Sequence, residues 1–218
     1  MFPTSIQEAA KFYIENGFRP MPLYGVHEKC KHRPYKPELD CKGQCWGKVP
    51  AEEHWPDKDF TESDFNENYN LALIMGKQLD GRWFLGLDID GKFDISEFLQ
   101  IPETLECSTA RGKHLIYEVP EDTPLGNYND IFSTRNKVIG YRFGYNGAVD
   151  MKYCRGAITS PPSHTKIGTQ LTWNEWRQPT LLPHSEIIYL LRKIKFKFPD
   201  VKRYRKWSLH PVHLNKKP

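Results

Sequence analysis

The 218-residue chain lacks any apolar run near the roughly 20 residues that a membrane-spanning helix needs. Residues 1–14 also lack the basic start and long apolar stretch of a secretory signal. With 39% hydrophobic and 27% charged residues, the composition is that of an ordinary globular domain. We therefore expect a soluble, cytoplasmic protein with no membrane partner.

Acidic residues are nearly missing from the C-terminal end. Residues 192–218 hold ten of the 31 Lys and Arg but only one of the 27 Asp and Glu, namely Asp200. Aromatic residues alternate with these cations, which suits the phosphates and unstacked bases of a single-stranded nucleic acid. A solvated helix face followed by a loose tail has the same composition. The charge pattern divides the chain into a main domain over residues 1–191 and a basic helix end and tail over residues 192–218.

Periodicity predicts helices and strands in mixture, without internal repeats. Ser5 and Glu8 are spaced as a capping box, and Gly17 follows the apolar pattern, so we predict a first helix over residues 4–17. Apolar residues in helical register predict a last helix over residues 185–196. Strands are expected over residues 18–24, 70–76, 83–90, 105–108, 113–119, 148–153 and 156–160, and a short helix over residues 95–99, whereas residues 129–145 have no clear pattern. Clustered strands with few helices favour an α+β fold with mixed or antiparallel sheets.

Four ionisable residues lie on short apolar runs. Asp88 and Asp90 are two positions apart in one predicted strand, so their side chains share a face roughly 6 to 7 Å apart. His114 and Asp150 lie on two further predicted strands. Mg²⁺ and Mn²⁺ prefer oxygen ligands, and Mg²⁺ is commonly held by one or two carboxylates with substrate phosphates. The three acids therefore predict a two-metal site that handles nucleotides.

Each of these residues also has a plainer interpretation. Asp88-Ile89-Asp90-Gly91 can be a strand that ends in a turn, His114 a buried structural histidine, and Asp150 a charge at a strand edge. A calcium-binding loop is disfavoured, because counting from Asp88 it would need Gly at Phe93 and Glu at Leu99.

Cysteine and histidine gather in an irregular stretch over residues 27–50. The residues with zinc-ligand chemistry there are Cys30, His32, Cys41 and Cys45, with His27 as an alternative to His32. Tetrahedral Zn²⁺ takes such Cys₃His sets and supplies folding energy to a loop without a core. Free buried thiols or a disulfide suit a Lys-rich cytosolic loop less well. We therefore predict a structural Zn²⁺ site in this insert.

Taken in chain order, the segments resemble the archaeo-eukaryotic primase superfamily, in particular the N-terminal catalytic domain of bifunctional DNA primase/polymerases. The resemblance covers residues 5–191 and rests on the order and spacing of short motifs. These motifs are the helix ending at Gly17, Gly47-Lys48-x-Pro50, residues 70–76, Asp88-Ile89-Asp90, Gly112-Lys113-His114, Asp150-x-Lys152, Gly156, Pro161-Pro162-Ser163, Gly168 and Trp173.

The resemblance implies roles for individual residues. Asp88, Asp90 and Asp150 would bind the catalytic Mg²⁺ or Mn²⁺, and His114 would contact the triphosphate of the incoming nucleotide. Further nucleotide contacts would come from Lys113, Arg111, Lys152, Lys48 and Ser163. The family's fold implies a catalytic core in two joined lobes over residues 1–191, with the zinc-binding insert at about residues 27–50. By the habit of the family, further domains of a larger polypeptide are expected as partners.

Several positions depart from the family pattern. Ala110-Arg111-Gly112 stands where the family usually has Ser-Gly-Gly, and Lys152 replaces an arginine, which loses bidentate geometry. Val49 stands at a usual histidine position. Thr165 stands where a histidine commonly follows Pro-Pro-Ser, and His164, one place early, is a weaker candidate.

The implied activity is that of a template-dependent nucleotidyltransferase, a DNA primase and DNA polymerase. Its partners would be a single-stranded DNA template with its primer and nucleoside triphosphates. Two alternatives stay open at this point. One is a metal-dependent nuclease that uses the same acids, and the other is a non-catalytic, zinc-containing module that binds single-stranded nucleic acid.

Overall fold

The computed structural model describes residues 2–26, 47–91, 95–97, 100–121, 123–133, 148–165 and 167–197. It is an α+β fold in which the described residues form the α-helices α1 (Ile6–Glu15) and α3 (His184–Lys197). The strands are β1 (Pro20–Leu23), β2 (Asn70–Ile74), β3 (Gly76–Lys77), β4 (Trp83–Asp90), β5 (Leu105–Ser108), β6 (Gly112–Val119), β7 (Tyr128–Ser133), β8 (Ala148–Lys152), β9 (Ala157–Thr159), β10 (Thr172–Glu175) and β11 (Thr180–Leu181). The predicted α+β class is confirmed. The predicted zinc ligands and residues 198–218 of the basic tail lie outside the described residues.

The elements follow the predicted patterns closely. At the start of α1, the Ser5 hydroxyl accepts a hydrogen bond from the backbone N–H of Glu8 at 3.2 Å. The strand predictions are confirmed to within a few residues. The short helix expected over residues 95–99 is a 3₁₀ helix at Ile95–Glu97, and β3, β7, β10 and β11 had no counterpart in the sequence patterns. None of the described helices is long and apolar enough to span a membrane.

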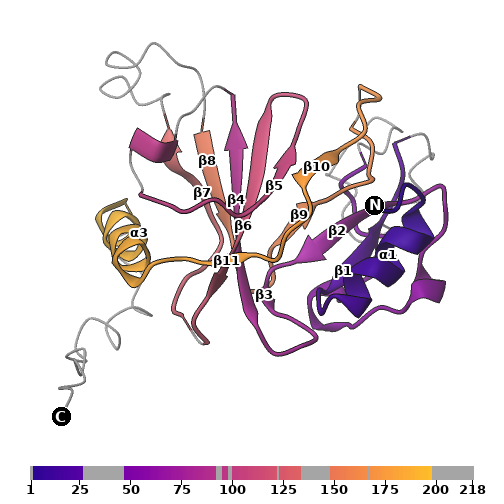
Figure 1. Ribbon diagram of the computed structural model, residues 1–218, viewed down its shortest axis with the longest axis horizontal. Helices are drawn as coiled ribbons and strands as arrows, with labels where there is room; N and C mark the ends of the chain where they lie inside the picture. The colour runs from indigo at the N-terminus through magenta and orange to yellow at the C-terminus, as the bar shows by residue number, and fades with distance from the viewer. Residues whose placement is uncertain are drawn as a thin grey trace.

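Two sheets form the body of the molecule (Figure 1). The small sheet has the strand order β1-β2-β9, and the large sheet has the order β10-β5-β6-β4-β8-β7, with β3 added to β4 and β11 to β6. Among the described strand pairs, only β11 and β6 run parallel. In Figure 1 the large sheet stands between α3 on one side and the small sheet with α1 on the other.

The two faces of β4 belong to two different cores. Leu85, Leu87 and Ile89 join the core that includes α3, whereas Phe84 joins the core that includes α1 and the small sheet. Because side chains alternate along a strand, Asp88 and Asp90 lie on the same face as Phe84. The acids therefore face the side of the large sheet on which the small sheet lies.

A glycine in β4 brings the two sheets close together. A Cβ atom at Gly86 would lie 2.1 Å from Cδ1 of Ile158, which is in β9 of the small sheet. Any larger residue would have to displace that side chain. Gly86 thus sets how near the small sheet lies to the strand that carries the acids.

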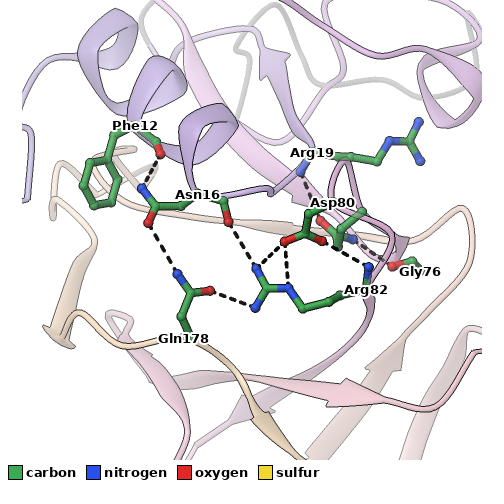
Figure 2. Close-up of polar contacts among 8 residues, drawn as sticks. Phe12, Asn16, Arg19, Gly76, Asp80, Arg82 and Gln178 are labelled. Carbon is green, nitrogen blue, oxygen red and sulfur yellow. Dashed lines mark hydrogen bonds and ion pairs between the residues drawn. The ribbon is translucent and has the colours of Figure 1, made fainter.

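A polar network ties the end of α1 to the large sheet (Figure 2). The Arg82 guanidinium donates to the carboxylate of Asp80 at 2.7 Å, to the backbone carbonyl of Asn16 at 3.1 Å and to the side-chain carbonyl of Gln178 at 2.9 Å. The Asn16 side chain in turn donates to the carbonyl of Phe12 at 2.8 Å. One planar cation therefore links the helix, the turn before β4 and the segment before β11.

A buried tyrosine makes a second link. The Tyr13 hydroxyl of α1 donates to the backbone carbonyl of Pro161 at 2.8 Å and accepts a hydrogen bond from the Trp173 indole N–H at 2.9 Å. Burial raises the pKa of Tyr13, so the hydroxyl stays protonated and can donate. The link fixes the loop after β9 against both α1 and β10.

We predict that Tyr13→Phe lowers the free energy of unfolding by about 1 to 3 kcal/mol, because it leaves the buried carbonyl of Pro161 and the partly buried N–H of Trp173 without their partner. Urea unfolding followed by circular dichroism measures the change. Tyr117→Phe is the matched comparison. Within the described residues the Tyr117 hydroxyl makes one hydrogen bond, to the carbonyl of Pro102, so the effect should be smaller. An unchanged midpoint for Tyr13→Phe would contradict the structural role of the link.

Candidate active site

Three ionisable side chains form one row across the large sheet. In the antiparallel register, Asp88 of β4 lies directly opposite His114 of β6 on one side and Asp150 of β8 on the other. Directly opposed residues share a face of the sheet, with Cα atoms about 4.5 to 5.5 Å apart. Asp90 lies two residues further along the same face, opposite Gly112 and Ala148. Residues far apart in sequence thus meet on one surface.

His114 and Asp88 contact each other directly. The His114 Nε2 atom is 3.3 Å from the Asp88 carboxylate, and the imidazole is buried. Burial by itself raises the pKa of Asp88. The hydrogen bond and charge of His114, with the nearby Lys48 and Lys152, outweigh burial and hold the pKa of that carboxyl below its usual range. Asp88 is therefore a carboxylate at neutral pH.

Each ring nitrogen of His114 has a different surrounding. Nε2 faces Asp88, whereas Nδ1 is buried and has no hydrogen-bond partner among the described residues. A buried polar atom without a partner costs stability and is uncommon in proteins. The imidazole therefore meets the acid row through Nε2.

The third acid is held by a lysine of its own strand. The Lys152 ammonium is 3.2 Å from the Asp150 carboxylate. The two residues are separated by one position in β8, so both side chains lie on the face that carries Asp88. The row thus combines carboxylates with compensating cations.

A cleft of about 330 Å³ opens beside this row. On the large sheet and its β5–β6 turn, the cleft is lined by Asp88, Asp90, His114, Thr109, Ala110 and Arg111. The opposing wall comes from the small sheet and the loops around it, and consists of Gly47, Lys48, Thr159, His164, Thr165, Ile167 and Leu171. Acids on one wall therefore face exposed cationic and histidine side chains on the other.

The donor set suits a hard divalent cation. Three carboxylates on one face supply the oxygen ligands that Mg²⁺ and Mn²⁺ prefer. As the side chains stand, no three His, Cys, Asp or Glu residues within the described part of the chain converge on one point. Asp88 is turned toward His114 and Asp150 toward Lys152, so shared coordination requires these side chains to change rotamer.

Three of the predicted nucleotide contacts, Lys113, Lys152 and Ser163, do not line the cleft. Lys152 pairs with Asp150 in the row beside it. Lys113 lies on the opposite face of β6, where its ammonium pairs with Glu106 at 2.8 Å, because it neighbours His114 in a strand with alternating side chains. Ser163 is fully buried, and its hydroxyl accepts from the N–H of Leu71 and donates to the carbonyl of the same residue. Ser163 therefore fastens a loop to β2. Lys48 and Arg111, in contrast, line the cleft.

Several cleft residues were not found by sequence reasoning. His164 was only a weaker candidate, and it lines the cleft beside Thr165, whose hydroxyl has no hydrogen-bond partner in the described part of the chain. Ile167 is 69% exposed at the mouth of the cleft. Its only signal in the sequence is an aliphatic residue within a polar turn. Asn70, at the start of β2, was placed in a strand without any role.

We predict that His114→Ala raises the pKa of Asp88, because the imidazole supplies the largest stabilisation of its charged form. With a folded-state pKa below that of the unfolded chain, Asp88 stabilises the fold above the ordinary carboxyl pKa of about 3.9 and loses this effect as the pH falls through the lower value. Carbon-13 NMR titration of the carboxyl groups in metal-free protein measures the shift.

The matched control for this titration is Lys113→Ala. Its side chain lies on the other face of β6, paired with Glu106, so the titration of Asp88 should stay as in the unaltered protein. A pKa of Asp88 that does not change in His114→Ala would contradict the contact between the two side chains.

Comparison with known proteins identifies the family of the chain. A search of curated proteins gave no match. A protein-family comparison matches residues 10–185 to the N-terminal domain of bifunctional DNA primase/polymerases, Prim-Pol. The match spans most of the chain and includes the row of Asp88, His114 and Asp150. The chain therefore belongs to the bifunctional DNA primase/polymerase family and carries its N-terminal domain.

Proposed function

We propose that the protein is a template-dependent DNA primase and DNA polymerase that joins nucleoside triphosphates into a chain on single-stranded DNA. Family membership indicates nucleotidyltransferase activity of this type, with DNA and nucleotides as substrates. The observation that carries the finer proposal is the register that aligns Asp88 with both His114 and Asp150 on one face of the large sheet. Asp88 and His114 of this row line the cleft. The two sheets would serve as the two lobes of the catalytic core, over residues 1–191.

The acids would hold divalent metal ions. Asp88, Asp90 and Asp150 have the ligand chemistry for Mg²⁺ or Mn²⁺. When bound, such ions polarise a phosphoryl oxygen, activate the attacking hydroxyl and stabilise the leaving group. Little covalent chemistry is then left to the protein, and its residues act by binding and orienting the substrates.

The cations of the cleft would bind the triphosphate. Lys48 and His164 on one wall, and Arg111 and His114 on the other, all line the same cleft. A nucleoside triphosphate carries several negative charges, and lysine, arginine and imidazole side chains are the usual donors to phosphate oxygens. A nuclease acting on phosphodiesters alone would have less need for this number of phosphate donors around its acids.

The experiment that tests the proposal is incorporation of labelled nucleotide on a single-stranded DNA template with Mg²⁺ or Mn²⁺. We predict that the unaltered protein extends a primer, and that Asp88→Ala lowers the rate at least about 100-fold while its circular dichroism is unchanged, since charge stabilisation at the reacting phosphate is lost. Asp57→Ala is the control, because that carboxylate is exposed, pairs with Arg155 and does not line the cleft.

The same assay separates the alternatives. Hydrolysis of DNA without any need for triphosphate would indicate a nuclease. Binding of single-stranded DNA without incorporation, and without effect of Asp88→Ala, would indicate a non-catalytic module. Full activity of Asp88→Ala would overturn the assignment of the metal site.

We further propose that the insert at residues 27–50 holds one structural Zn²⁺ through Cys30, His32, Cys41 and Cys45, or through His27 in place of His32. The ligand chemistry in the sequence supports this proposal, and the ligands lie outside the described residues. Metal analysis of purified protein should find about one zinc per chain, and Cys41→Ser with Cys45→Ser should abolish it. Zinc retained by the double variant would contradict the ligand set.

A further inference from the structure

A buried asparagine connects the two segments that form the small-sheet wall of the cleft. The Asn70 side-chain amide donates to the carbonyl of Gly47 at 3.1 Å and to the carbonyl of His164 at 2.7 Å. Its side-chain oxygen accepts from the backbone N–H of His164 at 2.9 Å. Asn70 is only 2% exposed, and the bond to Gly47 is buried whereas the two bonds to His164 are partly buried. One side chain thus joins segments that are 23 and 94 residues away in sequence.

The bonded segments end directly at cleft residues. Gly47 precedes Lys48, and His164 precedes Thr165, and all of these residues line the cleft. Neither Lys48 nor His164 is buried, so neither is held in place by core packing. The hydrogen bonds from the Asn70 side chain to the backbone of Gly47 and His164 therefore help to fix the Cα positions of Lys48 and His164.

The fit around Asn70 is tight. Gly47 has a positive φ of 69°, which favours glycine, and a Cβ atom there would lie 2.3 Å from the Asn70 side-chain nitrogen. On the other side, Ser163 bonds both backbone groups of Leu71, the residue after Asn70. The start of β2 is thus the point at which both wall segments are anchored.

We propose that Asn70 is a positioning residue for substrate binding. It holds Lys48 and His164 together as one wall that binds the anionic part of the nucleotide across from the acids. This inference rests on the proposed function for the identity of the ligand. An aspartate cannot replace Asn70 in this role, because it has no N–H and would place a carboxylate against two carbonyl oxygens. Serine or alanine would also lose the link to Gly47.

Equilibrium binding of a fluorescent nucleoside triphosphate with Mg²⁺, without template, tests the inference. We expect Asn70→Ala to raise the Kd about tenfold or more, because displaced binding groups lose much of their effect. Asn70→Asp should weaken binding at least as much. In primer extension, Asn70→Ala should raise KM for the nucleotide more than it lowers kcat, since Asn70 contacts neither metal ligands nor reacting atoms.

Asn127→Asp is the matched control for a structural role. The Asn127 side chain also bridges backbone groups, donating to the carbonyl of Cys154 at 2.9 Å and accepting from the N–H of Tyr153 at 2.7 Å, but it does not line the cleft. A loss of stability alone, at the buried Asn70 or at the exposed Asn127, would leave the Kd unchanged in folded protein. Urea unfolding gives the folded fraction of each variant.

A double-mutant cycle tests whether Asn70 acts through its two neighbours. In a protein that already carries Lys48→Ala and His164→Ala, adding Asn70→Ala should change the Kd by less than about twofold, because coupled residues are not additive. A full effect in that background would overturn the inference, and so would unaltered binding by Asn70→Ala in the otherwise unaltered protein. If the protein without any substitution binds triphosphate but fails to extend a primer, the proposed function fails and the positioning role stands. If it binds no triphosphate, both fail.

Discussion

The antiparallel register of β4 between β6 and β8 is the constraint on which the site depends. It places Asp88 opposite His114 and Asp150, so that three strands distant in sequence each supply one ionisable group to one row. A shift of one residue in either pairing would turn the partner side chain to the opposite face. The buried residues on the other face, including Leu87, Leu115 and Val149, oppose such a shift because they would be moved out of the core.

The alternation of side chains along β4 explains how this strand contributes both to a hydrophobic core and to the candidate active site. Toward its beginning, β4 packs Phe84 against the small sheet, and Gly86 lets Ile158 approach closely. Toward its end the same face carries Asp88 and Asp90, and the opposing wall carries Lys48, His164 and Thr165 beside the aliphatic Ile167 and Leu171. The cleft is therefore the part of the interface between the two sheets that apolar packing does not fill. Asn70 and Ser163 anchor the small-sheet wall of the cleft to β2.

Much of this was predictable from local pattern. Both helices and most strands followed from periodicity and capping, and the i, i+2 spacing placed Asp88 and Asp90 on one face. Strand β7 was missed because residues 129–145 lack a clear alternation. Motif order alone predicted that Lys113 contacts the nucleotide beside His114. Because side chains alternate along β6, Lys113 lies on the face opposite to the cleft. The roles of Ser163 and Asn70 depend on contacts between distant segments, which one sequence without its fold cannot reveal.

The central claim is that Asp88 and Asp150 share bound metal beside His114. Anomalous diffraction from crystals grown with Mn²⁺ and a nucleoside triphosphate tests it most directly. Manganese scatters anomalously, so its position can be found independently of which residues are thought to be its ligands. We predict a manganese peak between the carboxylates of Asp88 and Asp150, with the triphosphate extending toward His114 and Lys48. Manganese bound elsewhere, or Asp150 on the opposite face of the sheet from Asp88, would contradict the account.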